Sequence, residues 1–112
     1  MSPGLSPAEL QERLASAEAP LVVDVRKPVE FAVAHIPGAK NIPLDEIEER
    51  LDELHSDNGV LIYCINGART SQAEPLLYNN GIDNVLHLEG ALQGWIQGGN
   101  PIEKGGVKKT GW

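Results

Sequence analysis

One stretch of the sequence decides the fold: residues 60–70, which read Val60-Leu61-Ile62-Tyr63-Cys64-Ile65-Asn66-Gly67-Ala68-Arg69-Thr70. Its first half is apolar on successive residues and partly β-branched, which is typical of a strand covered on both faces of a parallel sheet. Gly67 permits the backbone angles of a tight loop. The stretch therefore predicts a buried strand that ends at Cys64, a loop, and a helix that begins after the loop.

The same strand pattern recurs along the chain, and helices are expected between the strands. The further strands are expected at 21–25 and 85–88, with shorter ones at 41–42 and 4–5. Ser6 and Glu9 form a capping box that predicts the start of the first helix. The other helices are expected at about 28–34, 44–54, 70–79 and 91–97. Alternating strands and helices predict an α/β domain with helices on both faces of the sheet.

Two of these helices carry a more specific prediction. The leucine and isoleucine residues between 44 and 54 are spaced three, four and three apart, which is typical of the apolar stripe of an amphipathic helix. The helix at 70–79 contains Pro75, which cannot donate a backbone hydrogen bond. We therefore expect a bend, or a delayed helix start near Ser71–Glu74.

Composition and charge exclude several classes of protein. The chain has 112 residues, of which 41% are hydrophobic and 22% charged, so it can form one core and is neither disordered nor embedded in a membrane. The net charge of −7 argues against nucleic acid and membrane as partners. The first residues lack the basic and apolar regions of a signal peptide, which favours a cytoplasmic location. The single cysteine excludes an internal disulfide.

Cys64 is the candidate nucleophile, because it follows a strand at the edge where open α/β sheets bind ligands. A loop that turns its backbone N–H groups inward beside a helix N-terminus stabilises an anion. Such a loop is expected to lower the pKa of Cys64 below its usual ~8.5 and to leave the thiol partly exposed. Arg69 would offer its guanidinium to an oxyanion or hold the loop. The alternative is that Cys64 is a small buried apolar residue without chemistry.

Three ordered motifs resemble the signatures of the rhodanese homology domain, and the likeness spans about residues 5–102. Residues 24–31 (Asp-Val-Arg-Lys-Pro-Val-Glu-Phe) and 35–43 (His-Ile-Pro-Gly-Ala-Lys-Asn-Ile-Pro) are similar to its first signature, 64–70 to its active-site loop, and 90–95 with 99–101 to its closing signature. The resemblance implies a three-layer α/β/α domain with a central five-stranded, mostly parallel sheet. Residues 1–102 would form this single domain, and residues 103–112 a loosely ordered tail.

The resemblance also implies the chemistry. The Cys64 thiolate would take the outer sulfur of thiosulfate or a persulfide, and a thiol, cyanide or a protein cysteine would accept it, without a metal or other cofactor. The substrate-binding residues would be Ile65, Asn66, Gly67, Ala68, Arg69 and Thr70. Asp24, Arg26 and His35 would support the loop, with Arg26 pairing locally, for instance with Glu30, and the His35 imidazole bonded to backbone. The protein would be a monomer or a weak homodimer.

Loop length and one substitution bear on the choice of activity. Cys64 through Arg69 is six residues, which resembles the sulfurtransferases of this superfamily, whereas the related phosphatases and arsenate reductases have a loop one residue longer. Ile65 stands where many active members carry arginine, which should weaken the attraction for the thiosulfate dianion. Two alternatives stay open: a non-catalytic or carrier-type module, and an arsenate reductase or phosphatase of the same fold.

Overall fold

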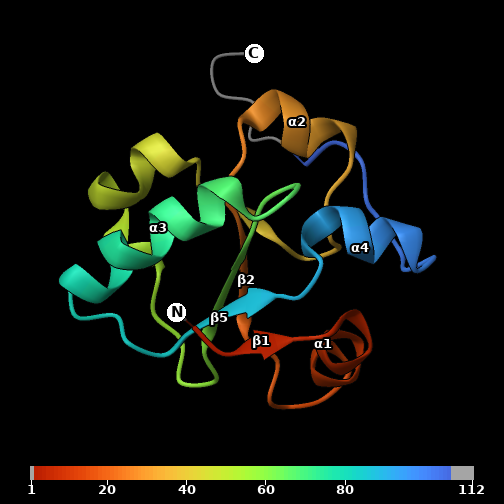
Figure 1. Cartoon of the computed structure of the whole chain (residues 1–112), viewed down its shortest axis with the longest axis horizontal. Helices are drawn as coiled ribbons and strands as arrows, with labels where there is room; N and C mark the ends of the chain where they lie inside the picture. The colour runs from red at the N-terminus through yellow and green to blue at the C-terminus, as the bar shows by residue number, and fades with distance from the viewer. Residues whose placement is uncertain (1, 107–112) are drawn as a thin grey trace.

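The computed structural model of the chain describes residues 2–106 and contains a five-stranded, wholly parallel sheet (Figure 1). The strands are β1 (Gly4–Leu5), β2 (Leu21–Asp24), β3 (Lys40–Asn41), β4 (Val60–Tyr63) and β5 (Val85–Leu88), in the order β1-β5-β4-β2-β3. The α-helices are α1 (Pro7–Leu14), α2 (Pro28–Val33), α3 (Ala68–Asn79) and α4 (Ala91–Gln97). Two 3₁₀ helices, η1 (Leu44–Glu49) and η2 (Leu51–Glu53), precede β4.

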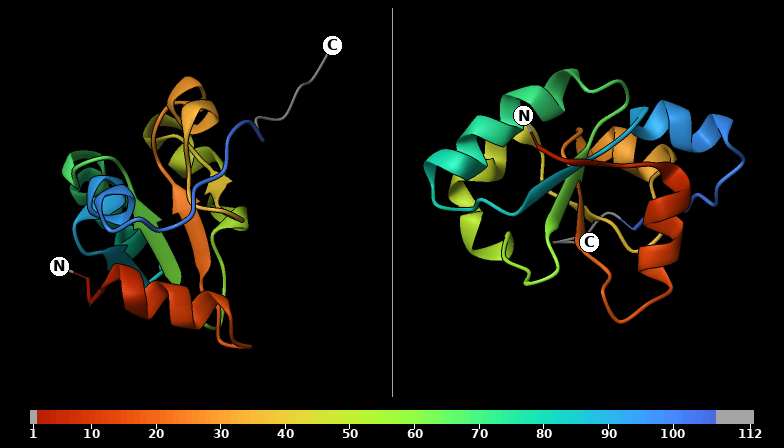
Figure 2. Two further views of the ribbon diagram at one scale, coloured as in Figure 1. Left: turned by 90° about the vertical axis from the view of Figure 1, so that its right-hand side faces the viewer. Right: turned by 60° about the horizontal axis from the view of Figure 1, so that its bottom comes forward.

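The sheet is the middle of three layers (Figure 2). On one face, α3 and η1 bury Ala73, Leu77 and Ile47 against the sheet, and the half-buried Leu51 of η2 packs against them. On the other face, α1 and α4 bury Leu10 and Trp95. Every residue of the central strand β4 is buried, which explains why its sequence is apolar without alternation. The predicted three-layer α/β/α fold is confirmed.

Local signals set several helix ends as predicted. Glu9 donates its backbone N–H to the Ser6 hydroxyl at 3.1 Å, and the Ser6 N–H bonds the Glu9 carboxylate at 2.8 Å, which is the expected capping box at the start of α1. Gly67 takes a left-handed conformation with φ of 91° directly before α3. The capping box fixes the start of α1, and Gly67 fixes the start of α3 and brings the loop after β4 into that helix.

The prediction of an α-helix at 44–54 is wrong. The chain forms η1 and η2, with hydrogen bonds such as Arg50 N–H to the Ile47 carbonyl and Leu54 N–H to the Leu51 carbonyl. These bonds span three residues rather than four, as in a 3₁₀ helix. A spacing of three between apolar residues suits either kind of helix, so the sequence pattern alone did not distinguish them.

The delayed start expected for the helix that contains Pro75 is also wrong. Helix α3 begins at Ala68 and continues through Pro75 to Asn79. A proline at this position leaves the Ser71 carbonyl without its backbone donor. Ser71 is exposed, so water can take the place of that donor, and Gly67 fixes the helix start upstream.

The segment after residue 102 is bonded to the domain as far as it is described. His35 and Glu103 exchange backbone hydrogen bonds at 2.9 and 2.8 Å, and Gly105 N–H donates to the Ala32 carbonyl at 2.8 Å. Residues 103–106 are therefore docked beside α2, where the sequence predicts a loose tail, while 107–112 lie outside the described residues. Within residues 2–106, no helix is long and apolar enough to cross a membrane.

Candidate active site

The loop that carries Cys64 is anchored to the start of α4. Cys64 follows the last residue of β4, and its carbonyl accepts the Leu92 N–H at 2.9 Å. The Ile65 carbonyl accepts the Gln93 N–H at 3.2 Å. Figure 1 shows the loop (green) beside the N-terminal end of α4 (blue). Because two backbone bonds hold its outer side, the loop presents its own N–H groups inward.

Hydrogen-bond donors converge on the Cys64 sulfur. The Gly67 N–H donates to Sγ at 3.0 Å, and the Thr70 hydroxyl donates at 3.4 Å. Burial raises the pKa of the Cys64 thiol, but the Thr70 hydroxyl and the backbone N–H groups of Thr70, Asn66 and Arg69 outweigh it and hold the pKa below its usual value. The predicted direction of the pKa shift is confirmed. This arrangement favours the thiolate, which is the nucleophilic form.

The expectation of a partly exposed thiol is wrong. Cys64 has 0% exposure, and its side chain belongs to the core cluster that includes Val25, Ile47 and Ala73. The loop closes over a sulfur that is already seated against the sheet and α3. A reactant must therefore displace part of the loop before it reaches Sγ.

Arg69 is held by an ion pair across the site. Its Nη1 lies 2.7 Å from Glu30 Oε1, which joins the first turn of α3 to α2. The same carboxylate oxygen accepts the Lys27 N–H at 3.2 Å at the start of α2. The hydrogen bond from Arg69 lowers the pKa of Glu30 below its usual value, so Glu30 is anionic near neutral pH. The ion pair ties the first turn of α3, directly after the loop, to α2.

Two small clefts flank the loop. One, of about 340 Å³, is lined by Val25, Lys27, Pro43, Leu44, Asp45, Arg69 and Gln72. The other, of about 190 Å³, is lined by Tyr63, Gly67, Thr70, Ser71, Glu74, His87, Leu88 and Ala91. Each includes a residue next to the sulfur or in the loop. They are the candidate approaches to Cys64 once the loop moves.

The comparisons with known proteins now identify the family. The rhodanese-like domain matches residues 6–97. The chain belongs to this family. A sulfurtransferase of Allochromatium vinosum is 42% identical over 93 residues, covering 83% of this chain and 87% of that protein. A putative sulfur carrier protein of Bacillus subtilis is 31% identical over 93 residues, covering 83% of this chain and 50% of that protein.

Solved structures agree with this assignment. The crystal structure of a rhodanese-related protein from Thermoplasma volcanium matches with a TM-score of 0.79 at 32% identity, covering 90% of this chain and 97% of that one. Membership of the rhodanese-like family, with a relative named sulfurtransferase, supports sulfur transfer as the general class of activity.

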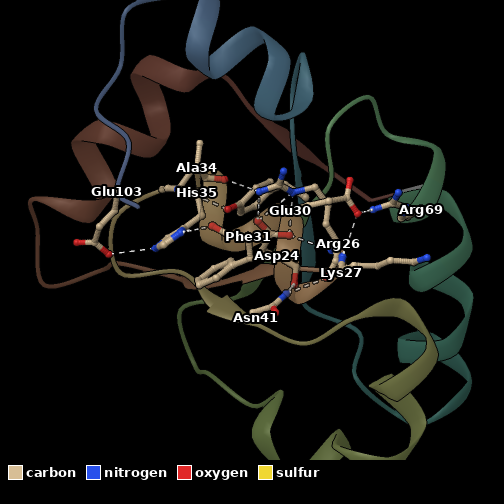
Figure 3. A network of polar contacts seen from close by, with 12 residues as sticks. Asp24, Arg26, Lys27, Glu30, Phe31, Ala34, His35, Asn41, Arg69 and Glu103 are labelled. Carbon is tan, nitrogen blue, oxygen red and sulfur yellow. Dashed lines mark hydrogen bonds and ion pairs between the residues drawn. The ribbon is translucent and has the colours of Figure 1, made fainter. Parts of the chain in front are cut away.

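In this rhodanese-like domain, Asp24 and Arg26 form a buried pair below the loop (Figure 3). Arg26 Nη2 lies 2.8 Å from Asp24 Oδ2, and the Arg26 backbone N–H donates to Asp24 Oδ1 at 2.9 Å. Arg26 also donates to the Ala34 carbonyl, and Asn41 donates to the carbonyls of both Asp24 and Arg26. The predicted local pairing of Arg26 with Glu30 is therefore wrong, because Glu30 forms its ion pair with Arg69. Burial lowers the pKa of Arg26, but the hydrogen bonds and charge of Asp24 outweigh it, so the pKa is raised and the guanidinium stays charged.

His35 is bonded to α2 and to the segment at residue 103. Its Nδ1 lies 2.7 Å from the Phe31 carbonyl, its Nε2 lies 3.2 Å from Glu103 Oε1, and its ring stacks on Phe31 at 3.6 Å. The imidazole is bonded to backbone, as expected, and it joins α2 to the segment at 103 (Figure 3).

The remaining loop residues differ in what they offer. The Asn66 carboxamide oxygen accepts the Ala68 N–H at 3.1 Å, so the side chain of Asn66 shapes the turn. Ile65 is 36% exposed and presents an apolar side chain outward.

Among residues 2–106, no group of three or more His, Cys, Asp or Glu side chains is placed to hold a metal ion.

The ion pair between Glu30 and Arg69 was not predicted from the sequence. Glu30 lies three residues after Lys27, at the helix position where an acidic side chain commonly caps the backbone, and this capping role was the only local signal. The pair joins positions 39 apart in the chain, which sequence spacing does not reveal.

Proposed function

We propose that this protein is a sulfurtransferase that carries sulfane sulfur as a persulfide on Cys64. The observation that carries the proposal is the convergence of the Gly67 N–H and the Thr70 hydroxyl on Sγ. Donors aimed at a sulfur stabilise its anionic form, which attacks other sulfur atoms. The same donors are suited to the negative charge of a persulfide.

The transfer has two steps, both displacements at sulfur. In the first, the Cys64 thiolate attacks the outer sulfur of thiosulfate or of a persulfide. A bond forms between Sγ and that sulfur, the donor's S–S bond breaks, and its electron pair leaves with sulfite or with a thiolate. In the second, cyanide, a small thiolate or a protein cysteine thiolate attacks the outer sulfur, and Cys64 leaves as a thiolate. The cycle needs one cysteine and no external oxidant or reductant.

The decisive experiment is mass spectrometry of the intact protein after treatment with thiosulfate or polysulfide. Wild type should gain the mass of one sulfur atom and lose it again on addition of cyanide. Cys64→Ser removes the only thiol of the chain, so it should gain nothing. The Ser16→Ala variant is a control for loss of a hydroxyl away from the site, because Ser16 is exposed and its hydroxyl donates to the Arg13 carbonyl in α1; it should gain and lose sulfur as wild type does. Failure of wild type to gain sulfur from every donor would overturn the proposal.

A carrier role is the second candidate, and the burial of Cys64 favours it. A sulfur that is reached only when the loop moves suits a partner protein that opens the loop more than a freely diffusing donor. The similarity to a putative sulfur carrier protein points the same way. A carrier would form the persulfide once and release it slowly, whereas an enzyme would turn over many times with a small acceptor. Steady-state thiocyanate formation from cyanide therefore separates the two.

A further inference from the structure

The cleft beside the loop has little net positive charge. Lys27 and Arg69 line it, but Asp45 lines it too, and its walls include the apolar residues Val25 and Leu44. Position 65, directly after the cysteine, contributes an exposed isoleucine rather than a cation. The attraction that this side of the site can offer a dianion comes from Lys27 and Arg69, of which Arg69 lies in the first turn of α3, directly after the loop.

Glu30 neutralises that cation. Its carboxylate lies 2.7 Å from the Arg69 guanidinium, and both side chains are about one-third exposed, at 32% and 34%. A donor that approaches Arg69 therefore meets an ion pair, whose field falls off faster with distance than that of a single charge. Glu30 also holds the Lys27 backbone N–H, so its position is fixed by α2 as well as by Arg69.

We propose that Glu30 is a positioning residue that sets donor specificity. By binding Arg69, it lowers the preference of the site for a doubly charged donor and favours donors with one negative charge, such as organic thiosulfonates and persulfides. This inference rests on the proposed sulfur transfer through Cys64. It goes beyond that proposal in two ways: it names Glu30 as the residue that selects the donor, and it states which donor charge is selected.

Thiosulfate and methanethiosulfonate form a matched pair of probes. In both, the Cys64 thiolate attacks the terminal sulfur, the bond from that sulfur to the central sulfur breaks, and the electron pair leaves. The leaving group is sulfite for thiosulfate and methanesulfinate for methanethiosulfonate. The two donors differ by a methyl group in place of one charged oxygen. The ratio of kcat/KM for the dianion to kcat/KM for the monoanion therefore reports charge selection, and a general loss of folding or loop stability cancels from it.

The test is this ratio in wild type and in Glu30→Gln, with cyanide as the acceptor. Glu30→Gln should raise it about threefold or more, because the unpaired Arg69 cation attracts a dianion more strongly than a monoanion. Glu9→Gln is the matched control: Glu9 has the same capping role in α1, away from the loop. It should leave the ratio unchanged.

Two further variants separate charge from structure. Arg69→Met leaves the Glu30 carboxylate without its partner and should lower the ratio. The double variant Glu30→Gln with Arg69→Met has neither charge and should return the ratio to near the wild-type value. The rise in Glu30→Gln should also shrink as salt is added, since screening weakens exposed charges.

The outcomes are distinct. Turnover with both donors and an unchanged or lower ratio in Glu30→Gln would overturn this inference and leave the proposed function standing. A ratio that rises equally in Glu9→Gln would also overturn it. Absence of turnover and of a persulfide in wild type, with these two donors and with polysulfide, would overturn the proposed function, and this inference with it.

Discussion

The neighbouring strands β4 and β2 end at the same edge of the sheet, and the buried charge at the end of each strand is stabilised in a different way. At the end of β4, the Cys64 sulfur is surrounded by the Gly67 N–H and the Thr70 hydroxyl, which are neutral donors. At the end of β2, Asp24 is paired with the opposite charge of Arg26. Donors with partial charges stabilise an anion without cancelling its charge, whereas a full counter-charge cancels it. The first arrangement suits a nucleophile, and the second suits a structural support.

The largest expected effect comes from breaking the pair at β2. Asp24→Asn leaves the Arg26 guanidinium buried without its counter-charge, so we expect a loss of about 3–5 kcal/mol in the free energy of unfolding. Chemical denaturation measures this loss. Asp24 makes no hydrogen bond to the Cys64 sulfur in the described residues, so the thiol pKa of the folded variant should stay close to that of wild type.

Glu53→Gln is the matched control for that variant. It breaks the ion pairs of Glu53 with Arg50 and with Lys40, in which the side chains are 29% to 41% exposed, and exposed pairs contribute only about 0–1 kcal/mol each. An equal loss of stability in the two variants would contradict the contrast between a buried support and a surface pair.

A smaller effect is expected from straining the loop at β4. Gly67 has a φ of 91°, and an alanine there should cost about 1–2 kcal/mol, although an added Cβ meets no atom within 4 Å. Since the Gly67 N–H bonds the sulfur, Gly67→Ala should also raise the thiol pKa of Cys64. Denaturation and the pH dependence of thiol alkylation measure the two effects.

Gly99→Ala supplies the comparison for this loop variant. Gly99 has a similar φ of 74° and equally open surroundings, but its N–H bonds the Ile96 carbonyl and not the sulfur. It should lose similar stability without a change in the thiol pKa. A pKa shift of the same size in Gly99→Ala would show that general destabilisation, rather than the amide at position 67, controls the thiol.

The sequence predicted features that depend on neighbours along the chain and missed those that depend on distant contacts. The buried strand β4, the loop start and the inward N–H groups follow from residues 60–70, where apolar succession and one glycine act locally. The kind of helix at 44–54 was not predictable, because a spacing of three fits both helix types. The Glu30–Arg69 pair and the docking of Glu103 on His35 join distant segments.

The full burial of Cys64 was missed for the same reason. The sequence places the cysteine at a strand end, where a loop residue is commonly open to solvent. Whether the sulfur is covered depends on the folded core, in which Cys64 shares a cluster with Val25, directly after β2, and with Ile47 of η1. The local signals identified the chemistry of the site, and tertiary packing decided its accessibility.

The smallest expected effect on stability, and the most direct on chemistry, comes from the hydroxyl of Thr70. The thiolate is the reactive form, so the alkylation rate of wild type should be lost as the pH falls through the folded pKa, which lies below the usual value. Thr70→Val removes one donor to the sulfur and should move this profile to higher pH, with alkylation about fivefold slower on the acid side. Thr70→Ser keeps the hydroxyl and should follow wild type. If Thr70→Val and Thr70→Ser moved the profile alike, packing rather than the hydrogen bond would set the pKa, and the contrast between neutral donors at β4 and a counter-charge at β2 would lose its chemical basis.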